Sequence, residues 1–472
     1  MKNIIFVLEY DILFLEVLSV KKLFGTDGVR GVANTELSPE LAFKLGRAGA
    51  YVLTKDAKST AKVLVAKDGR RSGDMLEAAL AAGLCSIGAQ VYQCGVMPTP
   101  AVAYLVQKYN FDAGVMITAS HNPVEDNGIK FFNSQGFKLP DRLEEEIEEL
   151  IAAIESNDTL TRPTGADVGV VKSCPNALDD YAAFVASTVP GLNLGGMKLA
   201  IDCANGATSE VAHVIFEKLG ASVHTLFNQP DGSNINANCG STHMGNLKEF
   251  VTANKMDLGL AFDGDGDRML AVDQNGNEVD GDLLLAICGL DLQQRGQLAG
   301  STIVATVMSN QGLEVFCKSH GITLLRAAVG DRYVLEKMLE GNFVLGGEQS
   351  GHTILRRFST TGDGILAGIH LLAALARQGK SLAQMSQMVE IFPQVLINVR
   401  VNKERMKDLY TCPKIKKVKD EIEAQFTGDD RILLRTSGTE PLVRVLFEGR
   451  DAGKINAWAK QLADAVKESL SE

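Results

Sequence analysis

The chain has 472 residues and a mass of 50.6 kDa, more than one hydrophobic core normally supports, so three or four domains are expected. Its hydrophobic content of 45% and charged content of 22% are ordinary for a globular protein. The net charge of −11 argues against a nucleic-acid surface, so any anion-binding site must be a local cluster of Arg, Lys and backbone N–H groups.

Residues 1–20 are apolar but contain Glu9, Asp11 and Glu16. These acidic residues leave no uninterrupted apolar run long enough for a transmembrane helix, and no signal-peptide cleavage pattern follows them. We therefore expect an N-terminal extension that the fold does not need, and no association with a membrane.

From Lys21 onward, expected strands and helices alternate. Ser38-Pro39-Glu40 is typical of a helix start, with a capping hydroxyl, an early proline and an acidic residue in the first turn. Further strands are expected at Val63–Ala66, Val91–Cys94 and Ala113–Ile117, and helices at Ser72–Ile87, Thr99–Tyr109 and Leu143–Ile154. This alternation predicts an α/β domain with a largely parallel or mixed sheet over residues 21–174.

A similar order of elements then recurs twice. The second set has strands at Lys198–Cys203, Val223–Phe227 and Leu258–Phe262 with a helix at 209–219, and the third has strands at Thr302–Val307, Thr323–Ala327 and Phe343–Leu345 with a helix at 312–319. Three such units of about 100 residues predict three related α/β domains, the second over 175–277 and the third over 278–391.

The order of expected strands and helices changes near Phe392. A strand at 395–401, a charged helical stretch near 403–426, strands at Arg431–Leu434 and Val443–Glu448, and a helix at 452–468 predict a smaller α+β domain over 392–472.

The most informative motif follows the expected strand Leu258–Phe262, where Asp263, Asp265 and Asp267 alternate with glycines. Three carboxylates this close repel one another unless a cation lies among them, and the glycines let the backbone curve so that the side chains converge. Oxygen ligands without His or Cys favour Mg²⁺ or Ca²⁺, with positions left open for a phosphate oxygen.

Two other interpretations of this motif are weaker. An EF-hand loop needs Gly at position six and a carboxylate at position twelve, where this chain has Arg268 and Gln274. A solvated acidic turn would need neither the preceding strand nor Arg268.

A second motif, T-A-S-H-N-P, follows the expected strand Ala113–Ile117 and carries Ser120 and His121. Strand ends are where α/β sheets place their sites, and a phosphoserine would supply the anionic oxygen that the aspartate cluster lacks. Lys130 follows and could serve the same pocket. The alternatives are an ordinary turn with His121 bonded locally, and a solvated Lys130 at a strand end.

Two further loops are rich in polar side chains. G-G-E-Q-S-G-H at 346–352 offers Glu348 and Ser350 to sugar hydroxyls and His352 for proton transfer, although a plain glycine-rich loop is an alternative. R-T-S-G-T-E-P-L-V-R at 435–444 has the arginines, hydroxyls and exposed backbone of a phosphate site, or of a hairpin with incidental arginines. F-G-T-D-G-V-R-G at 24–31 places Arg30 between glycines and is weak alone.

Together, T-A-S-H-N-P, D-G-D-G-D-R, G-E-Q-S-G-H and R-T-S-G-T-E-P resemble the motifs of the α-D-phosphohexomutases in order and spacing, over about residues 21–472. Within that family, F-G-T-D-G-V-R-G near the start, D-G-D-G-D-R and Gln349 resemble the corresponding residues of the members that act on glucosamine phosphates. The resemblance implies four domains around a central cleft, the first three topologically related, in a cytoplasmic enzyme. A homodimer is left open.

The resemblance also implies residue roles. Ser120 would be a phosphoserine, and a phosphate oxygen on it would bind one Mg²⁺ per chain together with Asp263, Asp265 and Asp267. Glu348 and Ser350 would hold sugar hydroxyls, and the non-reacting phosphate would be held by Arg435, Ser437, Gly438, Thr439 and Arg444. The reacting end would be lined by Arg30, His121, Lys130, Arg268 and His352, with the acid/base role open between Lys130 and His352.

The implied activity is that of an isomerase, an intramolecular phosphotransferase. It would interconvert glucosamine 6-phosphate and glucosamine 1-phosphate through glucosamine 1,6-bisphosphate, which would also prime the enzyme, and the product would feed UDP-N-acetylglucosamine synthesis. The alternatives are a phosphomannomutase or phosphoglucomutase of the same family, a phosphatase with Asp263 as nucleophile, for which Asp267 fits poorly, and a non-catalytic sugar-phosphate-binding protein.

Overall fold

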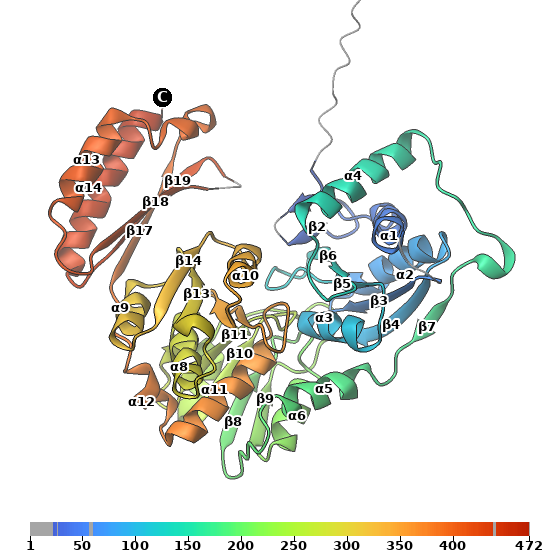
Figure 1. The fold of residues 1–472 in the computed structure, drawn as a ribbon, viewed down its shortest axis with the longest axis horizontal. Helices are drawn as coiled ribbons and strands as arrows, with labels where there is room; N and C mark the ends of the chain where they lie inside the picture. The colour runs from blue at the N-terminus through green and yellow to red at the C-terminus, as the bar shows by residue number, and fades with distance from the viewer. Residues whose placement is uncertain (1–21, 26, 56–59, 438–439, 472) are drawn as a thin grey trace, which may run out of the picture.

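The computed structural model describes residues 22–25, 27–55, 60–437 and 440–471. The expected extension over residues 1–20 lies outside these ranges. The described chain forms four separate sheets, three mixed and one antiparallel, and we name the units that carry them domains I to IV (Figure 1). The predicted fold class, three α/β domains followed by a smaller α+β domain, is confirmed.

The sheet of domain I has seven strands in the order β1-β2-β6-β5-β3-β4-β7. Their bounds are β1 Phe24–Gly25, β2 Gly28–Val32, β3 Lys62–Lys67, β4 Gln90–Val96, β5 Ala113–Ile117, β6 Asp126–Asn133 and β7 Val171–Ser173. Its helices are α1 Pro39–Thr54, α2 Ser72–Cys85, α3 Thr99–Lys108 and α4 Asp141–Ser156. Ser38 caps α1 as expected, because its hydroxyl accepts from the Leu41 N–H.

Domains II and III have smaller sheets. Domain II has the order β12-β11-β10-β8-β9, with β8 Lys198–Asp202, β9 Ser222–Leu226, β10 Leu258–Phe262, β11 Met269–Asp273 and β12 Glu278–Val279. Domain III has the order β14-β13-β15-β16, with β13 Thr302–Thr306, β14 Thr323–Ala327, β15 Leu345–Gly347 and β16 Thr353–Leu355. Their helices are α5 Ala177–Ser187, α6 Ala212–Lys218, α7 Gly245–Ala253, α8 Gly281–Gln294, α9 Gln311–Ser319, α10 Asp331–Glu340, α11 Gly364–Gln378 and α12 Leu382–Ser386.

The three sheets share a four-strand pattern. In each sheet, one strand has a parallel neighbour on either side, and the neighbour that comes later in the chain pairs antiparallel with the strand that follows it. The four-strand orders are β6-β5-β3-β4, β11-β10-β8-β9 and β16-β15-β13-β14. The connections β5–β6, β10–β11 and β15–β16 therefore occupy the same topological position in their domains. These connections contain the T-A-S-H-N-P, D-G-D-G-D-R and G-E-Q-S-G-H motifs.

Domain IV has an antiparallel sheet in the order β17-β19-β18, with β17 Gln394–Arg400, β18 Arg431–Thr436 and β19 Leu442–Glu448. Its α-helices are α13 Pro413–Glu423 and α14 Ala452–Leu470. The helical stretch expected near 403–426 is broken, because a 3₁₀ segment at Lys403–Asp408 ends before Pro413 starts α13. The strand expected at Phe343–Leu345 instead runs over Leu345–Gly347.

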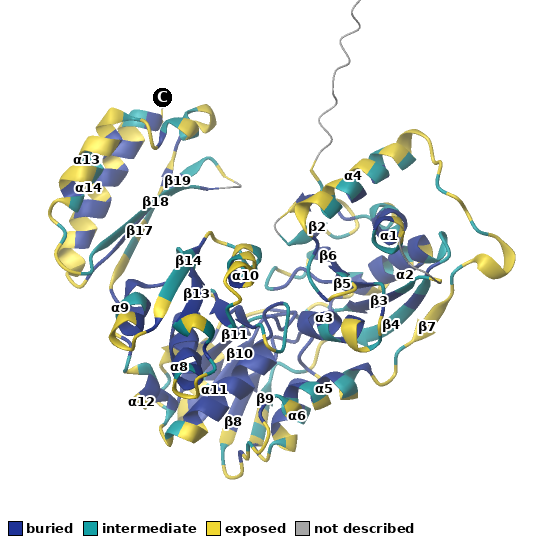
Figure 2. Ribbon diagram, in the orientation of Figure 1, coloured by how far each residue is buried: buried dark blue, intermediate teal, exposed yellow. Residues whose placement is uncertain are grey.

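Domains I, II and III contribute to one large hydrophobic core, domain I has a second core between its sheet and α1, α2 and α4, and domain IV has a core that it shares with no other domain. The shared core includes residues of α3, α5, α8 and α11, and Figure 2 shows α8 and α11 largely buried. The core of domain IV packs its sheet against α13 and α14. Among the described residues, no helix combines the length and hydropathy needed to cross a membrane.

Candidate active site

The connection between β10 and β11 carries Asp263, Asp265 and Asp267, whose side chains are buried. One ligand oxygen from each carboxylate lies within 4.8 Å of the others, so the expected convergence is confirmed. Neighbouring domains hold this loop on two sides: the Thr99 N–H at the start of α3 donates to the Asp265 carbonyl, and the Gly364 N–H at the start of α11 donates to the Gly266 carbonyl.

The unpaired oxygens and electrostatics of this loop fit a hard cation. Oδ1 of Asp265 and Oδ1 of Asp267 are buried without a hydrogen-bond partner. Burial, together with the neighbouring Asp265 and Asp267, holds the pKa of Asp263 well above its usual range. A divalent cation would relieve this repulsion, and three carboxylates suit Mg²⁺.

Ser120 lies in the connection between β5 and β6 and points at the aspartates. Its Oγ donates to Asp263 Oδ2 at 2.6 Å and lies 3.3 Å from His121 Nδ1. Burial, with the cationic Arg268 and Arg30 nearby, lowers the pKa of His121 to about 4, so this imidazole is neutral at neutral pH. The structure thus brings Ser120 and the aspartate cluster together.

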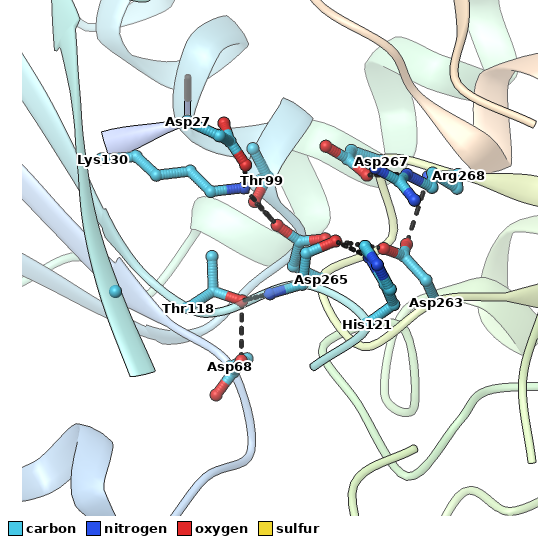
Figure 3. A network of polar contacts seen from close by, with 12 residues as sticks. Asp27, Asp68, Thr99, Thr118, His121, Lys130, Asp263, Asp265, Asp267 and Arg268 are labelled. Carbon is cyan, nitrogen blue, oxygen red and sulfur yellow. Dashed lines mark hydrogen bonds and ion pairs between the residues drawn. The ribbon is translucent and has the colours of Figure 1, made fainter. Parts of the chain in front are cut away.

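Lys130 lies within β6 and is 2% exposed, so it is not the solvated strand-end side chain considered from sequence. Its Nζ lies 2.9 Å from Asp265 Oδ2 and 2.9 Å from Asp27 Oδ2 (Figure 3). Burial lowers the pKa of Lys130, but these carboxylates outweigh it and leave the pKa above its usual value. Lys130 is therefore a cation held against the aspartate cluster.

His352 reaches the same cluster from the connection between β15 and β16. Its Nδ1 lies 3.4 Å from Asp267 Oδ2, its Nε2 lies 3.6 Å from Asp331 Oδ2, and its Nε2 accepts from the Gly362 N–H at 3.0 Å. Arg268 pairs with His352 through an isolated antiparallel bridge, which joins the loops of domains II and III.

Three charged residues that sequence reasoning did not select complete the network: Asp27, Lys138 and Asp331. Lys138 Nζ lies 2.7 Å from Asp27 Oδ1 and 2.6 Å from Asp331 Oδ2, so it links domain I to the start of α10 in domain III. Asp27 stands beside Arg30 in the F-G-T-D-G-V-R-G motif, which was a usable signal. Lys138 and Asp331 lie in no motif that we recognised.

A cavity of about 530 Å³ opens beside this network. Its lining includes Arg30, Asp27 and Asp331, together with Lys22, Leu23, Phe24, Gly25, Gly28, Asp141, Gly330, Arg332 and Tyr333. The cavity thus lies between the first strands of domain I and the start of α10, and a ligand there could reach the charged network.

The G-G-E-Q-S-G-H loop at 346–352 contributes polar groups at the edge of this region. Glu348 Oε1 accepts from the Gly330 N–H at 3.1 Å, and Gln349 Nε2 donates to Asp280 Oδ2 at 3.1 Å. Ser350 is exposed. Glu348 and Gln349 are therefore positioned by backbone and side-chain partners, while the Ser350 hydroxyl faces solvent.

The arginines of the last motif lie opposite each other on β18 and β19, where Arg435 pairs in register with Arg444. Directly opposed like charges destabilise a sheet, and both Nε atoms are buried without a partner. An anion between them would satisfy these donors. Ser437 lies at the end of β18, and Gly438 and Thr439 lie outside the described residues.

The β18–β19 hairpin that carries Arg435 and Arg444 is separate from the aspartate cluster. Among the described contacts, none links Arg435, Ser437 or Arg444 to the aspartates. The β18–β19 hairpin extends from domain IV toward the side of the molecule that holds β2 of domain I (Figure 1). The site residues thus form two groups, one around the aspartates and one on domain IV.

Comparison with known protein families gives matches along nearly the whole chain. Models of the phosphoglucomutase/phosphomannomutase family match as α/β/α domain I over residues 21–158, α/β/α domain II over 179–276, α/β/α domain III over 280–392 and the C-terminal domain over 396–465.

Curated relatives and solved structures agree with these matches. The chain is 55% identical over 453 residues to the phosphoglucosamine mutase of Acetivibrio thermocellus, with 95% of this chain and 99% of the relative covered. It is 54% identical over 450 residues to the phosphoglucosamine mutase of Ruminiclostridium cellulolyticum, covering 95% and 100%. A phosphoglucomutase/phosphomannomutase family protein from Burkholderia thailandensis has a TM-score of 0.77 at 25% identity, covering 94% and 97%.

Proposed function

Because this chain belongs to the phosphoglucomutase/phosphomannomutase family, we propose that it is a phosphoglucosamine mutase, an isomerase that interconverts glucosamine 6-phosphate and glucosamine 1-phosphate. The named relatives share half or more of their residues with it over nearly their full lengths. A pocket for a doubly phosphorylated sugar would need a phosphoryl donor, charge compensation and a second phosphate site.

The observation that carries the proposal is the short contact between Ser120 and the aspartate cluster. Ser120 Oγ lies 2.6 Å from Asp263 Oδ2, so a phosphoryl group on Ser120 would lie at the carboxylates and near Lys130. In the active enzyme, Ser120 is a phosphoserine.

The reaction consists of two phosphoryl transfers. In the first, the sugar O1 hydroxyl attacks the phosphorus of phospho-Ser120, so that a P–O1 bond forms and the P–Oγ bond breaks. The electron pair stays on Oγ, and the hydroxyl proton passes through a side chain of the site. The product is glucosamine 1,6-bisphosphate, and Ser120 becomes the hydroxyl that donates to Asp263.

The bisphosphate then reverses its orientation, and Ser120 Oγ attacks the phosphorus at O6. A P–Oγ bond forms and the P–O6 bond breaks, the proton of the Ser120 hydroxyl passes through a side chain of the site to O6, and glucosamine 1-phosphate leaves. Arg435, Ser437 and Arg444 hold the non-reacting phosphate in both orientations, assisted by Gly438 and Thr439. The same bisphosphate primes an enzyme that has lost its phosphate.

Asp263, Asp265, Asp267 and the Ser120 phosphate would hold one Mg²⁺, which stabilises negative charge on the transferring group. Arg30, His121 and Arg268 complement that charge from the protein side. Lys130 and His352 are the two candidates for moving the hydroxyl proton. Lys130→Met and His352→Gln, compared by their kcat in each direction, separate the two roles.

Glu348 and Ser350 hold the sugar hydroxyls, and Gln349 supports the loop. Glu348 also carries the one fixed negative charge of this loop, which favours a cationic amine at C2 without excluding other hexoses. A buried hydrogen bond made only to the right substrate discriminates by ~10²-fold or more.

The test is kcat/KM for glucosamine, glucose and mannose 6-phosphates. We expect glucosamine 6-phosphate to lead. Equal or higher values for glucose or mannose 6-phosphate would favour a phosphoglucomutase or phosphomannomutase of the same family. Release of inorganic phosphate without a mutase product would favour the phosphatase alternative.

A further inference from the structure

Ser120 has an unusual backbone conformation. Its φ is +54°, in the left-handed region that residues other than Gly, Asn and Asp rarely adopt. Such a conformation persists only where the surroundings over-determine it. The Ser120 N–H donates to Thr118 Oγ1, and the Ser120 carbonyl accepts from two side chains in different domains, so contacts at both ends of the residue constrain it.

Arg70, from the connection between β3 and α2, supplies one side of the constraint. Its fully buried guanidinium donates from Nη2 to the Ser120 carbonyl at 3.1 Å and to the Asn122 carbonyl at 2.8 Å. Its Nε donates to Asp68 Oδ2 at 2.9 Å, and Asp68 also accepts from the Thr118 hydroxyl at 2.7 Å (Figure 3). With its donors used in this way, Arg70 serves the backbone of the loop and not the reacting phosphate.

Domain II supplies the other side through Asn236. Its Nδ2 donates to the Ser120 carbonyl at 2.9 Å and to the Asn122 carbonyl at 3.0 Å, so it binds the same two oxygens as Arg70. The two domains approach closely here, because a Cβ added to Gly264 would lie 2.5 Å from the Ser120 carbonyl oxygen and 2.8 Å from Asn236 Nδ2.

We propose that Asn236 is a positioning residue for phosphoryl transfer: with Arg70, it clamps the Ser120 carbonyl between domains I and II and thereby fixes the direction in which Ser120 Oγ points toward Asp263. The inference rests on the proposed function, since it assigns Asn236 to the step in which Ser120 gives or takes a phosphoryl group. Two donors on the Ser120 carbonyl restrain rotation of that peptide plane, so the Cα–Cβ direction of Ser120 depends on domain II as well as on domain I.

Two substitutions of Asn236 test this role. Asn236 itself has a φ of +57°, so Asn236→Gly removes both hydrogen bonds without adding backbone strain. Asn236→Asp keeps the shape but places a carboxylate oxygen against two carbonyl oxygens. The matched control is Asn238→Gly, since Asn238 lies in the same loop with a φ of +54° but is exposed and makes no side-chain contact with the Ser120 loop among the described residues.

The decisive measurement is the first-order rate constant for loss of phosphate from phospho-Ser120 to glucosamine 6-phosphate in a single turnover, followed by quenching and intact mass. This constant does not depend on the fraction of protein that is folded. We expect both Asn236 variants to lower it at least tenfold with KM within about threefold of the wild type, and Asn238→Gly to leave it unchanged.

Rate constants within twofold of the wild type in both Asn236 variants would overturn the inference. Equal losses in Asn236→Gly and Asn238→Gly would also overturn it, because the loop as a whole would then be responsible. Failure of the proposed function is a different result: the wild type itself would show no phosphate on Ser120 or no transfer to the sugar.

Discussion

Ser120 and Asp263 share one of the hydrogen bonds that join domain I to the aspartate loop, and burial and the neighbouring carboxylates hold the pKa of Asp263 well above its usual range. Removing the hydroxyl therefore removes the nucleophile and one hydrogen bond to the aspartate loop, while the Ser120 backbone contacts remain. The chemical and structural roles of Ser120 can be separated for this reason.

Ser120→Ala should abolish mutase turnover and leave the thermal midpoint within a few degrees of the wild type. Peptide mass mapping of the wild type should find ~80 Da on the peptide that contains Ser120, the mass of one phosphoryl group. Full activity in the variant, or phosphate found only on another residue, would contradict the mechanism.

Asp265→Asn tests the metal site. We expect a fall in kcat of at least a hundredfold, with little change in metal-free stability, because loss of the Lys130 contact is offset by weaker repulsion among the carboxylates. Mg²⁺ at a hundred times its Kd should stabilise the wild type by about 2.7 kcal/mol, and this gain should disappear in the variant.

Asp273→Asn is the control for that experiment. Asp273 accepts three hydrogen bonds within a turn after β11, so its loss should lower stability but keep the response to Mg²⁺. An unchanged Mg²⁺-induced shift in Asp265→Asn would remove Asp265 from the metal site.

At the residue scale, the sequence identifies groups that end a strand within a short motif and misses those that meet only in space. The aspartates are found because they are adjacent in the chain. Asp331, Lys138 and Asn236 are not, because each is an ordinary polar residue until another domain is packed against it. Lys130 was recognised, but the carboxylates that pair with its buried charge, Asp27 and Asp265, come from two different loops.

At the scale of elements, the chain is predictable where a strand is fully buried. β5 and β10 have the expected bounds, because apolar runs of this length that end at polar residues are typical of buried strands. The charged stretch near 403–426 was less predictable, since the period of its side chains does not reveal the break before Pro413. The two strands were expected and their hairpin was an alternative interpretation of the motif between them, but the opposition of two arginines across it required the register.

Arg435→Ala tests the function of that hairpin. The change should raise KM and let free bisphosphate accumulate, since a bidentate charge-assisted contact contributes about 1.5–3 kcal/mol, or roughly 10- to 150-fold in affinity. Domain IV should not lose stability, because the change also removes repulsion with Arg444.

Arg400→Ala is the matched control, because Arg400 is an exposed arginine at the end of β17 in the same sheet. It should leave KM unchanged. The phosphate-site assignment fails if Arg435→Ala has the KM of Arg400→Ala and no bisphosphate is detected.

At the scale of the whole molecule, domains I to III are joined by one hydrophobic core, and domain IV has a separate hydrophobic core. The threefold pattern was visible in the sequence because each domain repeats the same strand order. The shared core was not visible in the sequence, because the helices that contribute to it, α3, α5, α8 and α11, come from separate parts of the chain.

Separate cores should give separate unfolding. Calorimetry of the full chain should resolve two transitions, the smaller from domain IV. Glucose 1,6-bisphosphate, which would contact both groups of site residues, should raise the domain IV transition and bring the two closer together. Arg435→Ala should weaken this coupling, and one ligand-insensitive transition would contradict the prediction.

The equivalent position of the three connections after β5, β10 and β15 has an evolutionary consequence. If one ancestral unit was copied, each descendant kept the same connection while its residues diverged, so that one came to carry Ser120, one the aspartates and one Glu348. Such copies inherit a shared location without a shared task. Substrate preference can then change through Glu348 in the third copy while Ser120, the aspartates and His352 are kept.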